Sequence, residues 1–571
     1  MKVKSFPFLL LVLLLVQFVS CRTSDTQTSG TQAVRGVTGT KGMVVSAHPE
    51  ATKIGLAILQ KGGNAYDAAV ATGFALAVAH PAAGNIGGGG FLVYRKSTGE
   101  TGTLDYRERG PAAATRDMYL DAQGNVHPDA SILGHLASGV PGAVDGLFET
   151  HQKLGSLPWA EVIQPAIDLA ARGVVLTQKE ASGLNGSRTS FLKANQFTPH
   201  LVKENSWKVG EVVPMADLAR TLERIRDKGK AGFYEGETAD LLVKEMQRGG
   251  GIITHQDLKS YTSVWRQAVS GTYKGYKVIS MPPPSSGGVA LLQLLKMVEP
   301  YDLQAWGWQQ PNTVHVMVEA ERRVYADRAK YLGDPDFFDV PVAELLDAEY
   351  LRNRMASMQL DSASSSAQVL AGEFMAHESD QTTHYSIVDQ WGNAASVTTT
   401  LNGSYGSKVV VEGAGFLLNN EMDDFSAKPG VPNMFGLIGG EANAIAPGKR
   451  MLSSMTPSIL EKDGELFMVV GTPGGSTIIT SVFQTILNVI DHSMSMQEAV
   501  SSPRFHHQWL PDEIQPEAKA LTPAVREKLR AKGHQVETRG NYGRVDGILR
   551  LPDGRWEGGA DPRGDDTALG Y

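Results

Sequence analysis

The chain has 571 residues, of which 42% are hydrophobic and 20% charged, so it can bury a large core and is neither disordered nor fibrous. Its formal net charge is −8, and acidic and basic residues are interspersed without long runs of one sign. This pattern argues against nucleic acid as a partner and favours small molecules.

The first twenty residues have the pattern of an export signal. Two lysines precede an apolar run, Phe6–Val16, that is shorter than the roughly 20 apolar residues of a transmembrane helix. Cys21, the only cysteine of the sequence, follows directly. The letters FVSC resemble the lipobox of bacterial lipoproteins, whose cysteine is lipidated and becomes the mature N-terminus. The alternative is an ordinary cut that leaves Cys21 as a free thiol.

We therefore expect residues 1–20 to be removed and the protein to reside in the periplasm or cell envelope, with a membrane contact only through a lipid on Cys21. Arg22 follows in place of the aspartate associated with inner-membrane retention in some bacteria, which favours the outer membrane. Residues 21–41 are rich in Ser, Thr, Gly and Gln, a composition typical of a flexible tether. The folded body is predicted to start at Gly42.

From Gly42 the chain alternates strand-like and helical segments. A short strand and a helix closed by Gly62 and Gly63 come first. Asn64 then caps a second helix of small residues, which Pro81 ends. No repeat and no linker divides the rest, so the sequence predicts one continuous body.

The glycine-rich run Gly84–Phe91 is not interpreted as a nucleotide loop, because a helix precedes it and a strand follows, the reverse of a dinucleotide fingerprint. It is expected to serve close backbone packing. The sequence has no HExxH and no paired CxxC. His506 and His507 are adjacent, and neighbouring strand residues point to opposite faces, so both are interpreted as structural. No metal and no cofactor is expected.

A stretch rich in hydroxyl side chains, QTTHYSIVDQWGNAASVTTTLNGSYG, begins at Gln381 and contains two runs typical of β-strands. A five-residue loop over 389–393 would place Val388 opposite Ala394. Counting back along both strands then places Thr382 opposite Thr400. The sequence therefore predicts a hairpin with a threonine pair at its open end.

Alternation along the two strands sorts the side chains of this hairpin onto two faces. One face is apolar and is predicted to be buried. The polar face carries Thr382, His384, Ser386, Ser396, Thr398, Thr400 and Asn402. From the pattern alone, these polar residues are interpreted as strand formers that face solvent.

Several motifs resemble those of the gamma-glutamyltransferases. They are TTHYSIVDQWGNAASVTTTLNGSYG, LLNNEMDDFSAKPGVPNMFGLIGG, PGKRMLSSMTPSIL, VVGTPGGS and, earlier in the chain, TLDYRERGPAAATRDM and GNIGGGG. They stand in the order of that family, and the similarity extends from about Gly42 to Tyr571. It implies an α+β fold, the four-layer αββα sandwich of the N-terminal nucleophile hydrolases, in which two stacked sheets lie between helices.

The resemblance also implies that a precursor cuts itself between Gln381 and Thr382. Residues 42–381 would form a large subunit and residues 382–571 a small one, both parts of one compact body. The new terminal Thr382 would be the nucleophile. A threonine hydroxyl needs a base, and its own α-amine, with an unperturbed pKa of about 7.7 to 8.0, can supply one.

Three more residues receive a catalytic role from the resemblance. Thr400 would hydrogen-bond to the hydroxyl of the nucleophile, in agreement with the register of the hairpin. Gly474 and Gly475 lie in a turn between a predicted strand and a predicted helix. Their backbone N–H groups would form an oxyanion hole, in which one donor is worth about 2.7 to 4 kcal/mol in other enzymes.

Six residues are implied to bind the amino-acid head of a donor substrate. They are Arg107, Ser453 and Ser454 for the α-carboxylate, and Asn402, Glu421 and Asp424 for the α-ammonium group. Such a head selects γ-glutamyl compounds, glutathione above all. The acyl group would then pass to water or to the amine of an amino acid or short peptide.

Two alternatives stay open. A related amidase of the same fold, such as a glutaryl-cephalosporin acylase, acts on a substrate without the α-amine. An inactive binding lipoprotein would keep the fold without chemistry. Pro429–Gly440 resembles the lid loop of bacterial members, with Phe435 where a tyrosine is common. Phenylalanine can shield the pocket but lacks the hydroxyl contact, so closure of the lid is expected to differ.

Overall fold

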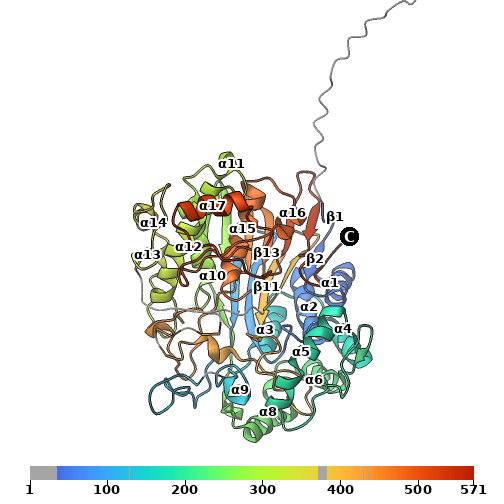
Figure 1. Cartoon of the computed structure of the whole chain (residues 1–571). Coiled ribbons are helices and arrows are strands. Elements are labelled where there is room, and N and C mark those ends of the chain that lie inside the picture. Colours follow the sequence, from blue (N-terminus) through green and yellow to red (C-terminus); the bar gives the residue numbers. More distant parts are fainter. Residues whose placement is uncertain (1–34, 128, 371–381, 429, 432, 435) are drawn as a thin grey trace, which may run out of the picture. The chain divides into compact units, whose positions relative to one another are not determined.

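The computed structural model describes residues 35–571 except 128, 371–381, 429, 432 and 435 (Figure 1). The predictions for the export signal, for Cys21, for Gln381 and for Phe435 lie outside the described residues. Among those that are described, no helix is both long enough and apolar enough to cross a bilayer.

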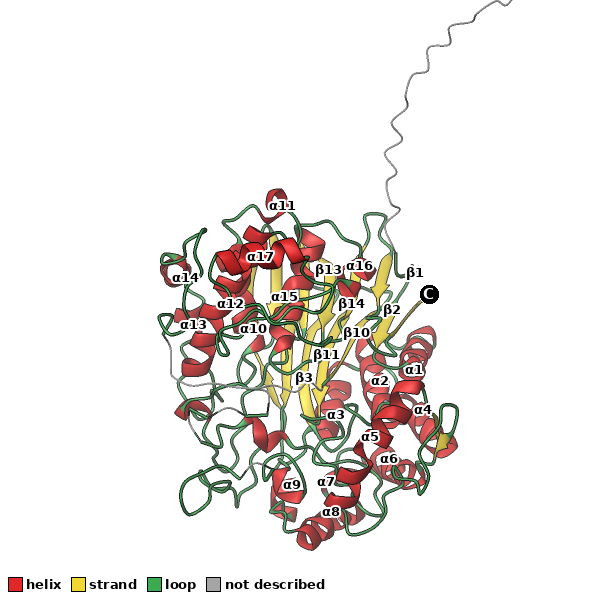
Figure 2. Ribbon diagram, in the orientation of Figure 1, coloured by secondary structure: helices red, strands yellow, loops and turns green. Residues whose placement is uncertain are grey.

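Two seven-stranded sheets form the centre of the body (Figure 2). The first has the order β1 (Val37–Gly39), β15 (Trp556–Gly559), β14 (Asp546–Arg550), β13 (Glu465–Gly471), β12 (Ser458–Lys462), β9 (Tyr276–Ser280) and β8 (Val269–Tyr273). The second has the order β16 (Thr567–Gly570), β2 (Met43–Ser46), β10 (Thr383–Val388), β11 (Ala394–Thr400), β3 (Gly89–Arg95), β4 (Thr101–Tyr106) and β7 (Val264–Arg266). Each sheet thus mixes strands from before and after Thr382.

Helices cover the outer face of each sheet. On the second sheet these are α1 (Pro49–Gln60), α2 (Ala65–Ala79) and α3 (Ala143–Leu154). On the first sheet they are α10 (Gly287–Val298), α15 (Thr477–Ile490) and α16 (Met496–Ser501), with α12 (Pro311–Tyr331) against α10. The inner faces pack on each other through β10, β11, β13 and β14, and their apolar residues form a core between the sheets. The predicted αββα sandwich is confirmed.

The remaining elements lie around this sandwich. They are α4 (Trp159–Arg172), β5 (Val174–Val175), α5 (Gln178–Ala194), β6 (Val212–Val213), α6 (Ala216–Lys228), α7 (Ala231–Tyr234), α8 (Gly236–Gly249), α9 (His255–Lys259), α11 (Leu303–Trp306), α13 (Val342–Leu345), α14 (Ala348–Met355) and α17 (Pro523–Ala531).

The first predicted helices are confirmed with their termini. The side chain of Asn64 caps α2 by accepting bonds from the N–H groups of Tyr66 and Asp67. The carboxylate of Asp67 in turn accepts a bond from the N–H of Asn64. The run before β3 packs closely, as predicted: a Cβ added at Gly88 would lie 2.1 Å from the carbonyl oxygen of Thr400. This approach brings the glycine run to the end of β11.

The folded body begins earlier than predicted. β1 pairs with β15 through Val37 opposite Gly558, and the N–H groups of Thr40 and Lys41 both donate to the carbonyl oxygen of Tyr571. Pairing of this kind uses backbone groups alone, so a stretch without large apolar side chains can still form an edge strand. Composition could not reveal it, and the proposed tether boundary at residue 41 is wrong.

The polar face of the β10–β11 hairpin does not meet solvent, contrary to the prediction from its pattern. His384, Ser386, Ser396 and Thr398 are fully buried between the two sheets. Ser386 Oγ donates to the carbonyl oxygen of Asp546 (3.2 Å), and Ser396 Oγ donates to that of Val470 (3.2 Å). The facing sheet satisfies these hydroxyls in place of water.

Candidate active site

Thr382 directly precedes β10, at the open end of the hairpin. The predicted register is confirmed, since Val388 pairs with Ala394 and Thr383 with Thr399. Thr382 is buried, and its Oγ1 lies 3.5 Å from Oγ1 of Thr400. That distance exceeds an ordinary O–H···O bond, so the contact places the two hydroxyls together without binding them tightly. Thr400 Oγ1 also accepts a 2.7 Å bond from the N–H of Asn402.

The glycine turn joins β13 to α15, as predicted. Gly474 and Gly475 have φ angles of +139° and +53°, and the N–H of Thr477 donates to the carbonyl oxygen of Gly474 (2.9 Å). A Cβ on Gly474 would lie 2.5 Å from Oγ1 of Thr477. The turn therefore requires glycine, and it directs the start of a 14-residue helix toward the hairpin end.

A cavity opens beside Thr382 on the Gly475 side of this turn. Its walls include Arg107, Thr400, Asn402, Asp424, Ser453 and Ser454. The volume is about 30 Å³. Of the predicted binding residues, Glu421 does not line this cavity and lies behind Arg107. We call this space the donor cavity.

Arg107 is fully buried and is held by carboxylates on its distal edge. Its Nη2 is 2.5 Å from Oδ2 of Asp424, and its Nη1 is 2.6 Å from Oε2 of Glu421. Glu108 lies further away, at 3.5 Å. The groups predicted for the α-carboxylate and for the α-ammonium of a substrate therefore pair with each other here.

Three carboxyl groups share this one guanidinium, and burial is the main influence on their protonation. Burial raises the pKa of Glu108 to about 7, while the positive charge of Arg107 acts in the opposite direction. Burial also raises the pKa of Glu421 and of Asp424, again opposed by Arg107. Burial therefore holds the pKa values of all three carboxyl groups above their ordinary range, against the opposing charge of Arg107.

The loop predicted to be a lid borders the donor cavity. Asn433, Leu437, Ile438 and Gly439 lie on its wall. Asn433 Nδ2 donates to Oδ1 of Asp424 (3.2 Å), which ties the loop to the Arg107 cluster. Asn433 uses Oδ1 of Asp424, while Arg107 uses Oδ2.

Residues 51–571 match the family model for gamma-glutamyltranspeptidase. The chain belongs to the gamma-glutamyltranspeptidase family. It is 46% identical over 534 residues to the glutathione hydrolase proenzyme of Escherichia coli, covering 93% of this chain and 92% of that protein. It is 48% identical over 539 residues to the corresponding proenzyme of Pseudomonas aeruginosa, covering 92% and 94%. The solved cephalosporin acylase of Bacillus halodurans is 28% identical, with a TM-score of 0.83 over 96% of this chain and 99% of that one.

Among the described wall residues of the donor cavity that the sequence did not predict, one is charged. Arg328, on α12, donates from Nη2 to Ser454 Oγ (3.0 Å) and from Nε to Ser286 Oγ (2.8 Å). It is buried, and within the described part of the chain no carboxylate lies at ion-pair distance from it; burial lowers its pKa to about 10. Its helix carries several basic residues, so no motif distinguished it.

The two adjacent histidines are structural, as predicted. His506 Nδ1 bonds with Thr480 Oγ1 (2.8 Å), and His507 Nε2 lies 3.3 Å from Oδ1 of Asp512. Both side chains are fully buried.

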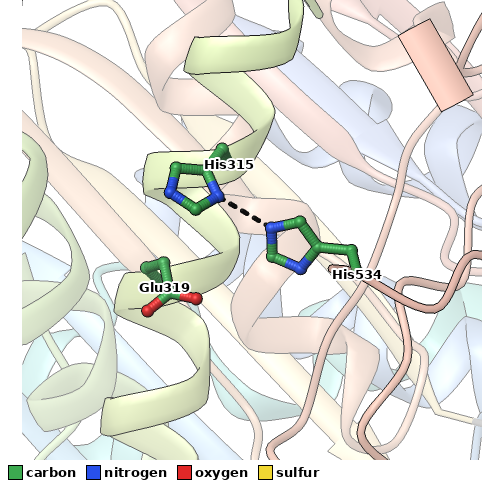
Figure 3. A group of neighbouring side chains, drawn as sticks. All are labelled: His315, Glu319 and His534. Carbon is green, nitrogen blue, oxygen red and sulfur yellow. Dashed lines mark hydrogen bonds between the residues drawn. The ribbon is translucent and has the colours of Figure 1, made fainter. Parts of the chain in front are cut away.

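A different set of residues in this family member has the composition of a metal site. His315 and Glu319, one turn apart on α12, face His534 (Figure 3). His315 Nδ1 and His534 Nε2 share a hydrogen bond of 2.7 Å. Glu319 already bonds to Arg323 Nη1 (2.6 Å) and to the N–H of Ser364 (3.0 Å). Because the carboxylate is neutralised by arginine, the set is better suited to joining α12 to its neighbours than to holding a cation.

Proposed function

We propose that this chain is a self-cleaving γ-glutamyltransferase and glutathione hydrolase. The observation that carries the proposal is the position of Thr382, buried at the open end of the hairpin, beside Thr400 and on the wall of the donor cavity. The name glutathione hydrolase proenzyme, given to the relatives from Escherichia coli and Pseudomonas aeruginosa, supports both the substrate and the processing.

Cleavage would start with attack of the Thr382 hydroxyl on the carbonyl carbon of Gln381. The acyl group moves from nitrogen to oxygen, which breaks the peptide C–N bond and frees the α-amine of Thr382. Water then hydrolyses the ester, which frees the hydroxyl of Thr382 and the carboxylate of Gln381. Cleavage therefore creates the base that activates the nucleophile in later turnovers. Thr400 is positioned to orient the hydroxyl, because its own oxygen is fixed by the N–H of Asn402.

Donor binding would replace the ion pair between Arg107 and Asp424 by two pairs with the substrate. The α-carboxylate takes the fork of Arg107 together with the hydroxyls of Ser453 and Ser454, and Arg328 holds Ser454 in place. The α-ammonium goes to Asp424, with Glu421 and Asn402 nearby. A zwitterionic head satisfies both sides of the cluster, whereas a donor with one charge leaves one side unpaired.

Turnover passes through an acyl-enzyme. Thr382 attacks the γ-carbonyl carbon, and the N–H groups of Gly474 and Gly475 stabilise the oxyanion. The leaving amine takes a proton from the α-ammonium of Thr382. Water or a second amine then attacks the ester, which gives hydrolysis or transfer.

The similarity to a cephalosporin acylase favours a second candidate, an amidase for glutaryl compounds. Such a donor lacks the α-ammonium and would leave Asp424 and Glu421 without their proposed ligand. Rates on matched γ-glutamyl and glutaryl anilides separate the two functions. Faster release from the glutaryl donor would favour the acylase.

A denaturing gel tests the processing. Purified protein should give two pieces, the smaller spanning residues 382–571, which is 190 residues. Thr382→Ala should stay one uncut chain, while Thr382→Ser, which keeps a hydroxyl, should still be cut. A single uncut wild-type band without turnover of a γ-glutamyl anilide would refute the proposal and favour an inactive binding lipoprotein.

The location in the cell envelope is part of the proposal and rests on the sequence alone. A lipid on Cys21 would carry the protein into the detergent phase on Triton X-114 partition, and Cys21→Ser would move it to the aqueous phase. Recovery of both the wild type and Cys21→Ser in the aqueous phase would contradict a lipid on Cys21 and would favour a secreted or periplasmic protein without an anchor.

A further inference from the structure

A second cavity reaches Thr382 from the opposite side of the glycine turn. Its volume is about 170 Å³, several times the roughly 30 Å³ of one liquid water molecule. Its walls include Thr382, Gly474, Tyr542, Gly543, Arg544 and Arg563. Thr382 is the one described residue that lines both this space and the donor cavity, so the two cavities meet at the nucleophile.

Two arginines line this second cavity, and one of them has no capacity to bind a ligand. Arg563 donates from Nε and Nη2 to the two carboxylate oxygens of Glu517 (2.8 and 2.6 Å), and from Nη1 to Asp561 (3.0 Å). Its remaining donors bond to the carbonyl oxygens of Val500 and Ser502. All five N–H groups of this guanidinium are used, and its role is structural.

Arg544 differs, because part of its fork is free. Its Nε lies 3.0 Å from Oδ2 of Asp566, and its Nη2 donates to the carbonyl oxygen of Ala47 (3.4 Å). Nη1 has no hydrogen-bond partner among the described residues, and the side chain is 21% exposed. The charge of Arg544 is balanced by Asp566, so a ligand would be recognised by the free edge of the fork and not by an excess of positive charge.

The backbone fixes Arg544 relative to the catalytic turn. Its N–H donates to Oγ1 of Thr472, two residues before Gly474 (2.9 Å). Gly543, with a φ of +67°, packs so closely that a Cβ on Gly474 would lie 3.5 Å from its Cα. The main chain of Arg544 is therefore bonded to the segment that leads into the oxyanion turn, and Gly543 lies in van der Waals contact with the turn.

The proposed function gives this second cavity a chemical role. The amino-acid head of the donor fills the first cavity, so the amine part of the γ-glutamyl bond must extend to the other side of Thr382. By microscopic reversibility, the amine that attacks the ester approaches along the path by which the first amine left. When the substrates are peptides or amino acids, the leaving amine and the accepting amine each carry a carboxylate of their own.

We propose that Arg544 binds the carboxylate of the leaving and accepting amine, which makes this second cavity the acceptor site. The accepting class is an amino acid or short peptide with a free carboxylate. In the transfer step its nitrogen bonds to the acyl carbon and the ester C–Oγ bond breaks. A proton passes from that nitrogen through the α-amine of Thr382 to Oγ. The inference rests on the proposed function.

The test compares a free dipeptide with its C-terminal amide as acceptors from one γ-glutamyl anilide donor. For the wild type, kcat/KM for the free dipeptide should exceed that for the amide by about tenfold, as expected for a hydrogen bond to a charged group. In Arg544→Gln this ratio should fall close to one, and Arg544→Lys, which keeps the charge but not the fork, should lie between. Arg550→Gln, which alters an exposed arginine paired with Glu465, should keep the wild-type ratio.

Each outcome decides the inference. A wild-type enzyme that does not distinguish acid from amide overturns it without any variant, which covers the case in which Arg544→Gln does not fold. An unchanged ratio in an active Arg544→Gln overturns it as well. A wild type that neither cuts itself nor releases the anilide contradicts the proposed function instead, so the two failures are distinguishable.

Discussion

Arg107 and Asp424 are joined by an ion pair of 2.5 Å, although the two side chains are proposed to bind opposite ends of one donor molecule. Both side chains line the donor cavity of about 30 Å³, and Asn433 of the lid loop bonds to the same carboxylate. The lid loop and Arg107 therefore share one carboxylate. Substitutions in this cluster should affect donors according to the charges that the donors carry.

Asp424→Asn should lower kcat/KM for a γ-glutamyl anilide by about a hundredfold, because a buried charge pair with the α-ammonium is lost. A glutaryl anilide, which has no ammonium group, should change by less than about tenfold. Initial rates on the two donors measure the difference. Asp553→Asn, at an exposed pair with Arg555, serves as the control. Equal losses on both donors would contradict the assignment of Asp424.

Thr400→Val should slow self-cleavage and lower the free energy of unfolding by about 1 to 3 kcal/mol. The valine removes the acceptor for the buried N–H of Asn402 and the hydroxyl beside Thr382. Thr400→Ser should retain both. The cleavage half-time is read from gels of freshly expressed protein.

Thr399→Val is the matched control for that substitution. Thr399 is the neighbouring residue, but its Oγ1 donates to the carbonyl oxygen of Gly89 on the other face of the strand (2.7 Å). Thr399→Val should lower the free energy of unfolding by an amount similar to that of Thr400→Val, while self-cleavage still proceeds. If both variants slow cleavage alike, the effect of Thr400 is general destabilisation.

His534→Gln should change how stability depends on pH. Burial lowers the pKa of His534 to about 3, against about 6.5 in the unfolded chain. The unfolded state therefore binds the additional proton below pH 6.5, and the stability that neutral His534 contributes is lost as pH falls from 6.5 toward 3. The wild type should lose about 1.4 kcal/mol per pH unit in that window through this residue alone.

Comparison of the two proteins isolates this contribution from the buried carboxyl groups, which titrate in both. His534→Gln should be the less stable protein at pH 7.5, since it loses the bond to His315, and the gap should narrow toward pH 5. Urea titrations at several pH values measure the gap. A gap that stays constant would show that the pKa of His534 is the same in the folded and unfolded states.

Gly471→Ala should destabilise the fold by about 1 to 3 kcal/mol. A Cβ at this end of β13 would lie 2.3 Å from the ring of His384, which is fully buried two residues after the nucleophile. Self-cleavage of Gly471→Ala should also be slower than that of the wild type. Gly186→Ala, on an exposed position of α5 with no atom within 4 Å of the added Cβ, should instead stabilise by about 0.5 to 1 kcal/mol. Thermal unfolding checks both.

The local geometry of the hairpin was predictable because the period of a strand and the length of a loop fix which residues face each other. Val388 opposite Ala394 and the proximity of Thr382 to Thr400 follow from counting alone. The environment of the polar face was not predictable. Whether Ser386 and Ser396 meet water or the carbonyl oxygens of Asp546 and Val470 depends on strands about 70 to 160 residues away.

The same distinction separates the site residues that were predicted from those that were not. Arg107 and Asp424 lie in motifs that a family resemblance brings together. Arg328 and Arg544 line the two cavities beside Thr382 and lie on a helix and a loop whose sequences show only ordinary amphipathic or turn patterns. Their relevance can be recognised only in the three-dimensional structure, where the N–H groups of each guanidinium can be compared with the hydrogen-bond acceptors around it.

The interleaving of strands in both sheets has a consequence for reversibility. β10 begins directly after the proposed cut and pairs on one side with β2, which precedes the cut by more than 300 residues, and on the other with β11. Once cut, the two chains are held by non-covalent contacts alone, the shared sheets and the packing of α10 on α15 among them, and after unfolding they would have to find each other by diffusion. Heating should therefore inactivate the mature enzyme for good at low concentration, while the uncut Thr382→Ala chain, with every strand on one polypeptide, regains its fold.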